Sequence, residues 1–228
     1  MKKLVALLLA VCMLLGLMTT VFAADEKSND IVILHTDDAH CGVNDNLGYA
    51  GVAAYKADME QTHNFVTLVD CGDAVQGAPI GLLSAGSYLV DIMNEVGYDV
   101  VTPGNHEFDY GMDQFLNVIV PKMKATYVSA NFMKDGKRVF DAYKIMTFGE
   151  KKVAFVGIST PETLVKSTPT YFQDKYGNYI YDFCNDKTGD KLYKAVQTAV
   201  DAAKKAGADY VVAVAHLGAD TASAPWTS

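Results

Sequence analysis

The 228-residue sequence is poor in cysteine and in basic residues, and it shows neither internal repeats nor low-complexity stretches. Cys12 lies in the N-terminal segment. Three cysteines follow it, Cys41, Cys71 and Cys184, and an odd number of cysteines does not indicate a disulfide framework. Lysine and arginine number 19 against 27 aspartates and glutamates, which gives a net charge of −8. Such an acidic chain has no general attraction for nucleic acid backbones or anionic lipid. Any phosphate chemistry therefore needs a local source of positive charge, and metal ions are the obvious candidate.

The first 23 residues form a segment of their own. "MKK" supplies positive charge, Leu4–Met18 form an apolar run, and Val21 and Ala23 offer small residues before a cleavage point. This pattern predicts a secretory signal peptide that is cleaved after Ala23, and export of residues 24–228. The apolar run is shorter than the roughly 20 residues of a membrane-spanning helix, so no stable membrane anchor is expected after cleavage. Periplasm, cell wall and medium are all open as destinations.

After this segment, apolar strand-like runs alternate with segments of helical periodicity. Strands are predicted at 31–36, 65–70, 99–104, 126–131 and 210–217, helices at 48–62, 87–97, 111–123 and 187–206, and a hairpin at 138–159 that turns at 148–152. This order indicates an α/β protein whose largely parallel sheet is covered on both faces, and the hairpin makes that sheet mixed. The aromatic-rich segment 161–186 is long for a loop. We expect it to be a covering lobe packed on the sheet edge, with a substrate-facing lip as the alternative.

Acids and histidines gather where the predicted strands end. In open α/β sheets, ligands bind beyond the carboxyl ends of the strands. Four strand ends carry candidate ligands, and three of the five histidines, His40, His106 and His216, are among them. The candidates are Asp37, Asp38 and His40 after the first strand, Asp70 and Asp73 after the second, Asn105, His106, Glu107 and Asp109 after the third, and His216 at the end of the last. This clustering predicts a metal site at one edge of the sheet.

The first motif is "HTDDAHCG" at residues 35–42. In an extended chain, residues two positions apart point the same way, so Asp38 and His40 can hold one cation together. Asp37 then points elsewhere and is assigned no metal role. The alternative for Asp38 is a helix cap or a turn residue.

The second motif, "DCGDAVQGAP", places Asp73 directly after a glycine. Glycine lets the backbone bend so that the carboxylate reaches back over the strand end. A carboxylate can bridge two cations with its two oxygens, and Asp73 is the candidate for that role. Asp70 is expected to be a strand-end residue whose carboxylate bonds to backbone amides.

The third motif, "GNHEFD", is the most specific. Asn105 offers a carbonyl oxygen, a hard ligand suited to a divalent cation. His106 faces a different direction and can contact substrate, while Asp109 is close enough in a tight turn to hold the imidazole in one tautomer. The alternative for His106 is a buried structural histidine, and Glu107 is expected at the surface. His216 would be a weak signal alone, but it joins the other three sets at the same edge.

In this order, the motifs "ILHTDDAH", "GDAVQGAP", "GNHEFDYG" and "AHLG" resemble those of the calcineurin-like metallophosphoesterase superfamily. More narrowly, they are similar to those of the secreted 5′-nucleotidases and 2′,3′-cyclic-nucleotide 2′-phosphodiesterases. The resemblance extends from about Ile31 to Gly218. It implies a four-layer αββα sandwich with mixed, largely parallel sheets that holds two divalent metal ions. Zinc, manganese or a mixture of both would suit carboxylate, amide and imidazole ligands.

The resemblance also implies a set of metal ligands. Asp38 and His40 would bind the first metal, and Asp73 would bridge both metals. Asn105 and His216 would bind the second.

The same resemblance assigns the residues that act on substrate. His106 would be the catalytic histidine that stabilises the phosphoryl transition state, and Asp109 would orient it. Asn105 and His106 would both contact the substrate. The family usually has asparagine where this chain has Asp37, which adds negative charge beside the site without removing a ligand.

The resemblance breaks off toward the C-terminal end of the sequence. The family places a further Gly-His-x-His segment and a nucleotide-binding domain after the motif of His216, whereas this sequence stops at Ser228. Residues 24–228 are therefore interpreted as the metallophosphoesterase catalytic domain of a longer gene product.

Together these inferences predict a secreted phosphoesterase that hydrolyses nucleotide phosphates. It would act as a 5′-nucleotidase, a 2′,3′-cyclic-nucleotide phosphodiesterase or both, by attack of a metal-activated hydroxide on phosphorus. The expected partner is a small nucleotide or cyclic nucleotide rather than a nucleic acid polymer. Two alternatives are a truncated metal-binding remnant without turnover and an exported solute-binding protein. The second alternative explains the fold class but not the ligand types at four strand ends.

Overall fold

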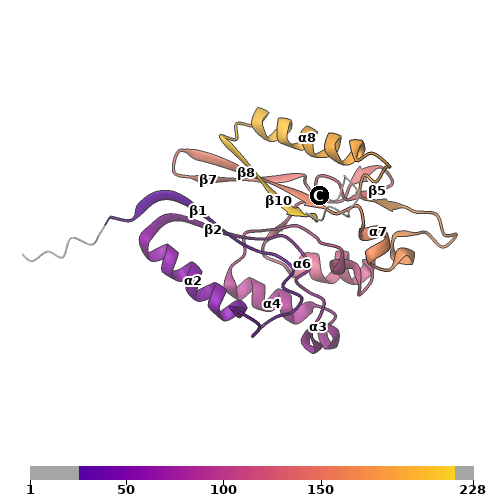
Figure 1. Ribbon diagram of the computed structural model, residues 1–228, viewed down its shortest axis with the longest axis horizontal. Coiled ribbons are helices and arrows are strands. Elements are labelled where there is room, and N and C mark those ends of the chain that lie inside the picture. Colours follow the sequence, from indigo (N-terminus) through magenta and orange to yellow (C-terminus); the bar gives the residue numbers. More distant parts are fainter. Residues whose placement is uncertain (1–25, 219–228) are drawn as a thin grey trace, which may run out of the picture.

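The computed structural model describes residues 26–218, so the predicted signal peptide and residues 219–228 lie outside the described part of the chain. Two β-sheets lie face to face, and helices cover their outer faces (Figure 1). Within residues 26–218, no helix combines the length and the apolar character needed to cross a membrane.

The first sheet is parallel throughout and has the strand order β1-β2-β3-β4. Its strands are β1 (Ser28–Thr36), β2 (His63–Asp70), β3 (Val100–Val101) and β4 (Thr126–Tyr127). β1 and β2 pair from Ile31 opposite Phe65 to Thr36 opposite Asp70, so the loops that follow these two strands begin side by side.

The second sheet is mixed and has the order β10-β8-β7. It contains β7 (Tyr143–Phe148), β8 (Lys151–Ser159) and β10 (Tyr210–His216). The predicted hairpin is confirmed for β7 and β8, which pair antiparallel from Phe148 opposite Lys151, but residues 137–138 belong to a separate small sheet. β10 runs parallel to β8, and His216 ends level with Ser159.

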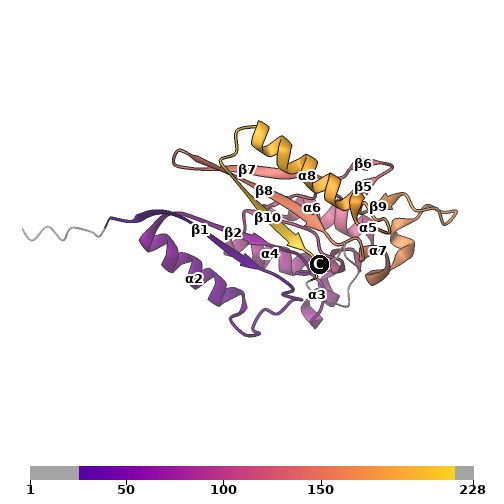
Figure 2. The ribbon, with the colours of Figure 1, turned by 45° about the horizontal axis from the view of Figure 1, so that its top comes forward.

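Two sheets form in place of the single mixed sheet that the alternation of strands suggests. Between them, Val69 and Val100 of the first sheet pack in one cluster with Phe155 and Val214 of the second. Because helices bury the outer face of each sheet as well, the strands are apolar on both faces, and a sequence cannot show whether such strands share one sheet or two. The architecture is the expected four-layer αββα sandwich (Figures 1 and 2).

The outer helices follow the predicted pattern with one addition. α2 (Gly48–Thr62), α4 (Ser87–Val96) and the continuous helical stretch of α5 (Met112–Gln114), η2 (Phe115–Ile119) and α6 (Val120–Lys122) lie on the side of the first sheet, and α8 (Asp190–Lys205) lies on the side of the second. The addition is α3 (Pro79–Ser84), for which a loop was expected. Pro79 occupies its first position, where a backbone N–H would have no partner within the helix, so the missing N–H of proline costs no hydrogen bond.

Residues 161–186, called the covering lobe below, pack beside the third motif. The lobe contains α7 (Thr163–Lys166), η3 (Pro169–Phe172) and β9 (Tyr181–Asp182), and β9 joins β5 (Met133–Lys134) and β6 (Lys137–Arg138) in a third sheet. Phe172 and Phe183 are fully buried, and their ring centroids lie 5.3 and 5.5 Å from that of Phe108 in η1 (His106–Phe108). This packing agrees with the covering role, and the first turn of the lobe also borders the cleft described next.

Candidate metal centre

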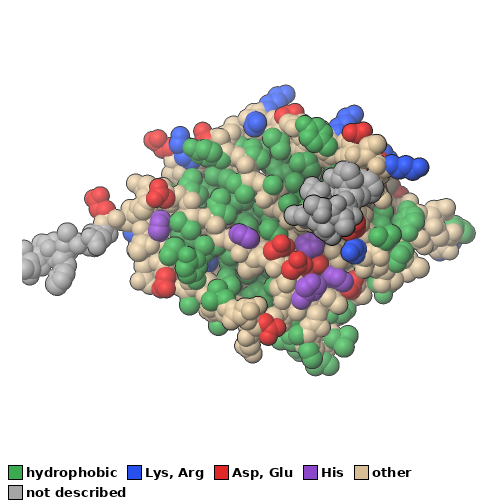
Figure 3. Space-filling model, viewed as in Figure 1, with side chains coloured by type: hydrophobic (Ala, Val, Ile, Leu, Met, Phe, Trp, Pro, Cys, Tyr) green, Lys and Arg blue, Asp and Glu red, His purple; other side chains and the backbone are tan. Residues whose placement is uncertain are grey.

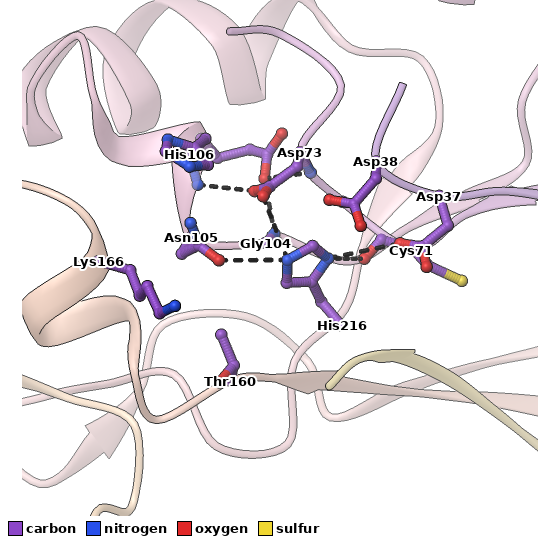
Figure 4. Close-up of polar contacts among 12 residues, drawn as sticks. Asp37, Asp38, Cys71, Asp73, Gly104, Asn105, His106, Thr160, Lys166 and His216 are labelled. Atoms are coloured by element: carbon purple, nitrogen blue, oxygen red, sulfur yellow. Dashed lines mark hydrogen bonds and ion pairs between the residues drawn. The ribbon is translucent and has the colours of Figure 1, made fainter. Parts of the chain in front are cut away.

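The segments that follow β1, β2, β3 and β10 surround a cleft of about 310 Å³. The residues that line it are Asp37, Asp38, His40, Asp73, Asn105, His106, Thr160, Glu162, Lys166, His216, Leu217 and Gly218. Histidine and acidic side chains gather at one place on this face of the molecule (Figure 3). Figure 4 shows Asp73, Asn105 and His216 directed toward one another. All five residues predicted as metal ligands therefore border one cleft, together with His106.

The loop after β1 brings Asp38 and His40 together, but not through the extended geometry predicted from their spacing. β1 ends at Thr36, and the φ angles of Asp38 and His40 are +52° and +42°, in the left-handed region. Their amides donate to the carbonyl oxygens of Gly72 and Asp73 at 3.1 and 2.8 Å. Asp38 Oδ1 and His40 Nε2 lie 3.6 Å apart. Left-handed non-glycine residues cost on the order of 1–3 kcal/mol each, and such strain is typical of functional sites.

Asp73 lies at the centre of the cleft and is 2% exposed. Its φ of +57° follows Gly72 at +108°, so the bend predicted at this glycine is present. Asp73 Oδ1 accepts the backbone N–H of His106 at 2.7 Å. Asp73 Oδ2 faces His216 Nε2 at 3.2 Å and His40 Nε2 at 3.8 Å. A single oxygen thus faces both histidines, whereas the predicted bridge used both oxygens.

The two histidines that face this carboxylate each have their other ring nitrogen close to a backbone carbonyl. His216 Nδ1 lies 3.1 Å from Cys71 O, and His40 Nδ1 lies 3.2 Å from Gln76 O. Such bonds orient a metal-binding imidazole and direct its Nε2 toward the cation. His216 Nε2 also lies 3.3 Å from Asn105 Oδ1. The rings are therefore fixed in the orientation that metal binding needs.

Asp37 lies beside His216, and the expectation that it points away from the site is wrong. Asp37 Oδ1 is 3.5 Å from His216 Nδ1, and Asp37, Asp38 and His216 offer ligand atoms within 4.8 Å of one another. The left-handed turn at Asp38 explains the error, since the chain does not continue the pleat of β1. Burial would lower the pKa of His216, but the bonds to Asp37 and Asp73 and the charge of Asp73 outweigh it and raise the pKa to about 11. The surroundings of His216 therefore favour positive charge.

His106 and Asp109 form a close pair beside these ligands. η1 is a tight 3-10 turn, and it places His106 Nδ1 2.6 Å from Asp109 Oδ2, the contact expected from their spacing. The hydroxyl of Ser167 donates to the other carboxylate oxygen of Asp109 at 2.7 Å. His106 also offers a ligand atom within 4.8 Å of those of His40 and Asp73. Its imidazole is therefore held at the edge of the same centre.

Glu107 is buried within the site, and the prediction of a surface position is wrong. It is 3% exposed, and its carboxylate accepts the N–H groups of Asp73 and Ala74, both at 2.9 Å, and of Gly104 at 2.6 Å. Burial and the charge of Asp73 raise the pKa of Glu107 to about 7. Because its donors come from the loops after β2 and β3, Glu107 ties these two loops together. No local signal in the sequence distinguishes it from a surface glutamate.

Asp70 has the structural role predicted for it. It is 2% exposed, and its carboxylate accepts the N–H of Gly72 at 2.9 Å and the hydroxyl of Thr36 at 2.5 Å. Burial raises the pKa of Asp70 to about 8. It does not line the cleft, so it supports the end of β2 rather than the centre itself.

The donor atoms fit two divalent cations that share Asp73. Atoms bound to one cation at about 2.0–2.2 Å lie roughly 3–3.6 Å from one another. The pairs Asp73–His216 at 3.2 Å, His216–Asn105 at 3.3 Å and Asp38–His40 at 3.6 Å lie in this range, and Asp73–His40 at 3.8 Å is just beyond it. Carboxylate, amide and imidazole donors of this kind suit zinc and manganese.

The three cysteines between residues 26 and 218 are free thiols. Burial raises the pKa of Cys41, Cys71 and Cys184 to about 11 in each case. Within the described residues, none of them belongs to the groups that could hold a metal ion.

Comparison with known proteins gives sequence relatives over most of the chain. A family model described as bacterial capsule synthesis protein PGA_cap matches residues 23–228. The snake venom 5′-nucleotidase of Naja atra is 29% identical over 210 residues, which are 84% of this chain and 37% of that protein. The 5′-nucleotidase of Vibrio cholerae is 30% identical over 205 residues, which are 85% of this chain and 34% of that protein. The chain thus spans about a third of the length of these relatives.

Solved structures share the fold. The calcineurin-like phosphoesterase YfkN from Bacillus subtilis aligns with a TM-score of 0.68 and 23% identity over 83% of this chain and 63% of that one. The 5′-nucleotidase precursor from Thermus thermophilus aligns with a TM-score of 0.69 and 23% identity over 82% of this chain and 37% of that one. The chain therefore belongs to the family of the matched model and, with its 5′-nucleotidase relatives, to the calcineurin-like metallophosphoesterase superfamily.

Proposed function

We propose that this protein hydrolyses nucleotide phosphate esters at a centre of two divalent cations. The observation that carries the proposal is the position of Asp73, whose Oδ2 faces the Nε2 atoms of His216 and His40 at 3.2 and 3.8 Å. Asp38 completes one side of this arrangement and Asn105 the other, as a carboxylate shared by two cations requires. Bound cations would supply positive charge for the phosphate and lower the pKa of a coordinated water.

His106 is the proposed catalytic residue. Its Nδ1 is bonded to Asp109, which leaves Nε2 to donate a hydrogen bond to a phosphate oxygen as charge develops there. The nucleophile is water rather than a side chain, so no phosphoenzyme should form. Trapping a phosphorylated protein by acid quench would contradict this mechanism.

Lys166 supplies a positive charge that belongs to the protein itself. Among the residues of the described chain that line the cleft, it is the only lysine or arginine. Figure 4 shows its side chain extending from the lobe toward Asn105 and Thr160. An ammonium group in this place can pair with a phosphate oxygen that the cations and His106 leave free.

The proposed substrate class follows from the sequence relatives. The relatives named above are 5′-nucleotidases, so 5′-mononucleotides are the first candidates. The resemblance of the motifs adds 2′,3′-cyclic nucleotides as the second. Residues 24–228 would be the catalytic domain, exported after cleavage of residues 1–23. Zinc, manganese or both would occupy the centre.

The test combines metal content with turnover on the mature chain, residues 24–228. We expect about two bound cations per chain and manganese-dependent hydrolysis of 5′-AMP, with 2′,3′-cyclic AMP tested beside it. Bound metal without hydrolysis of either compound would overturn the proposal in favour of the metal-binding remnant. Saturable nucleotide binding that a chelator does not change would favour a solute-binding protein.

A further inference from the structure

The carboxylate of Asp109 has two separate partners. Oδ2 lies 2.6 Å from His106 Nδ1, and Oδ1 accepts the hydroxyl of Ser167 at 2.7 Å. Ser167 lies 58 residues further along the chain, in the covering lobe. We propose that Ser167 is a positioning residue, which orients the imidazole of His106 by fixing the carboxylate of Asp109. This inference rests on the proposed function for the catalytic role of His106, but not for the orientation itself.

The hydroxyl of Ser167 is presented from a firmly held part of the lobe. Ser167 directly follows α7, and its N–H donates to Thr163 O at 3.2 Å. Thr163 is fully buried, and its hydroxyl donates to Thr160 O at 2.6 Å. A few residues further on, the fully buried Phe172 packs against Phe108 of η1. The lobe and the turn that carries His106 therefore form one packed unit, in which the hydroxyl has little freedom to leave Asp109.

Two bonds constrain the carboxylate where one would not. With Oδ2 bonded to the imidazole alone, the carboxyl group can rotate and carry the ring with it. Within residues 26–218, Ser167 is the only other side chain that donates to the Asp109 carboxylate. Both Ser167 and the Asp109 side chain, which is 21% exposed, are only partly accessible to water, so water replaces the hydroxyl poorly. Ser167 is therefore placed to set the direction of His106 Nε2 into the cleft.

Kinetics of three variants separate positioning from a purely structural role. Ser167→Ala should lower kcat for 5′-AMP about 3- to 10-fold, the range of one hydrogen bond, with KM and metal content unchanged. Ser167→Thr keeps the hydroxyl and should restore most of the rate. In a His106→Ala background, Ser167→Ala should cost no further rate, because a residue that acts through His106 has nothing left to position.

The matched control is Ser28→Ala, which removes a serine hydroxyl bonded to the N–H of Asp30 at the other end of β1. It should leave kcat unchanged. An equal loss from Ser167→Ala in the wild-type and His106→Ala backgrounds would overturn the proposal, as would failure of Ser167→Thr to recover the rate.

A second measurement does not depend on turnover. In ¹H–¹⁵N spectra of the side-chain imidazoles, the Nδ1–H of His106 should be protected and shifted by its bond to Asp109. Ser167→Ala should speed its exchange or move its resonance, whereas Ser28→Ala should not. If the wild-type chain hydrolyses no nucleotide but the resonance responds, the proposed function fails and the positioning stands. An unchanged His106 resonance in Ser167→Ala overturns the positioning, whatever the activity.

Discussion

The cleft has two walls that differ in how they are built. On one side, the loops after β1, β2 and β3 carry the buried acids Asp73 and Glu107, and their backbone is strained, with left-handed φ angles at Asp38, His40 and Asp73. On the other side, the covering lobe rests on an aromatic cluster and brings Lys166 and Ser167 to the cleft and to Asp109. The loops hold the atoms that could bind cations. The lobe supplies Lys166, which could pair with the phosphate, and Ser167, which bonds to the Asp109 carboxylate beside His106. Changes to the candidate metal ligands of the loop wall should therefore abolish metal binding and turnover together, whereas changes in the lobe should lower turnover or substrate affinity and leave metal binding intact.

The largest effect is expected on the loop side, at Asp73. Asp73→Asn replaces a charged oxygen that faces two histidines with a neutral amide, so both cation sites should lose affinity and hydrolysis should fall below detection. Metal content by mass spectrometry of dialysed protein measures the first effect. Asp70→Asn, in the same motif but outside the cleft, is the control and should keep its metal. Two bound cations in Asp73→Asn would show that this carboxylate is not shared.

The next effect separates turnover from metal binding. His106→Ala removes the group proposed to stabilise the phosphoryl charge, and the rate of 5′-AMP hydrolysis should fall about 10²–10⁴-fold. Metal content should remain at the wild-type value, because Asp38, His40, Asn105 and His216 are untouched. A loss of metal equal to the loss of rate would instead make His106 a metal ligand, which its distance from His40 and Asp73 allows.

Sequence motifs predicted the residues of the loop wall better than their geometry. Asp73 and Asn105 could be placed because parallel strands end at one edge, and strand ends can be read from apolar runs. The local conformation could not, because left-handed turns at non-glycine residues have no clear sequence signature. For that reason the extended geometry predicted for Asp38 and His40 and the outward direction predicted for Asp37 were wrong. The two-oxygen bridge at Asp73 stays a prediction.

Glu107 and the lobe show a second limit of sequence reasoning. The partners of Glu107 are amides from residues 73, 74 and 104, and those of Ser167 lie 58 residues away. Such contacts depend on how the sheets and the lobe pack, which periodicity does not encode. The fold class was predictable because it depends on repeated apolar patterning. The division into two sheets came only from the resemblance of the motifs to a known family.

Glu107 should link the stability of the loop wall to its metal affinity. Glu107→Gln exchanges one acceptor oxygen for an NH₂ group that faces a backbone N–H, and an unsatisfied buried donor costs about 1–3 kcal/mol in the free energy of unfolding. Because Asp73 shares this backbone, metal affinity should fall as well. Chemical denaturation and metal titration check both effects. Glu95→Gln on the exposed face of α4 should change neither. Wild-type stability in Glu107→Gln would mean that the loops do not depend on this carboxylate.

The smallest effect is expected on the lobe side, at Lys166. Its side chain is 59% exposed and its ammonium lies 3.8 Å from a carboxylate oxygen of Glu162, so water and this neighbour already screen its charge. Lys166→Ala should therefore raise KM for 5′-AMP only about 2- to 5-fold, the effect of one screened ion pair, and leave metal content unchanged. Lys187→Ala, an exposed lysine that does not line the cleft, should leave KM unchanged. The size of the effect should shrink as salt rises, since a partly exposed pair is screened within about 10 Å at 0.1 M. A fall in kcat with KM unchanged would instead place Lys166 at the reacting phosphate, and the lobe would then contribute to the chemistry as directly as the loops do.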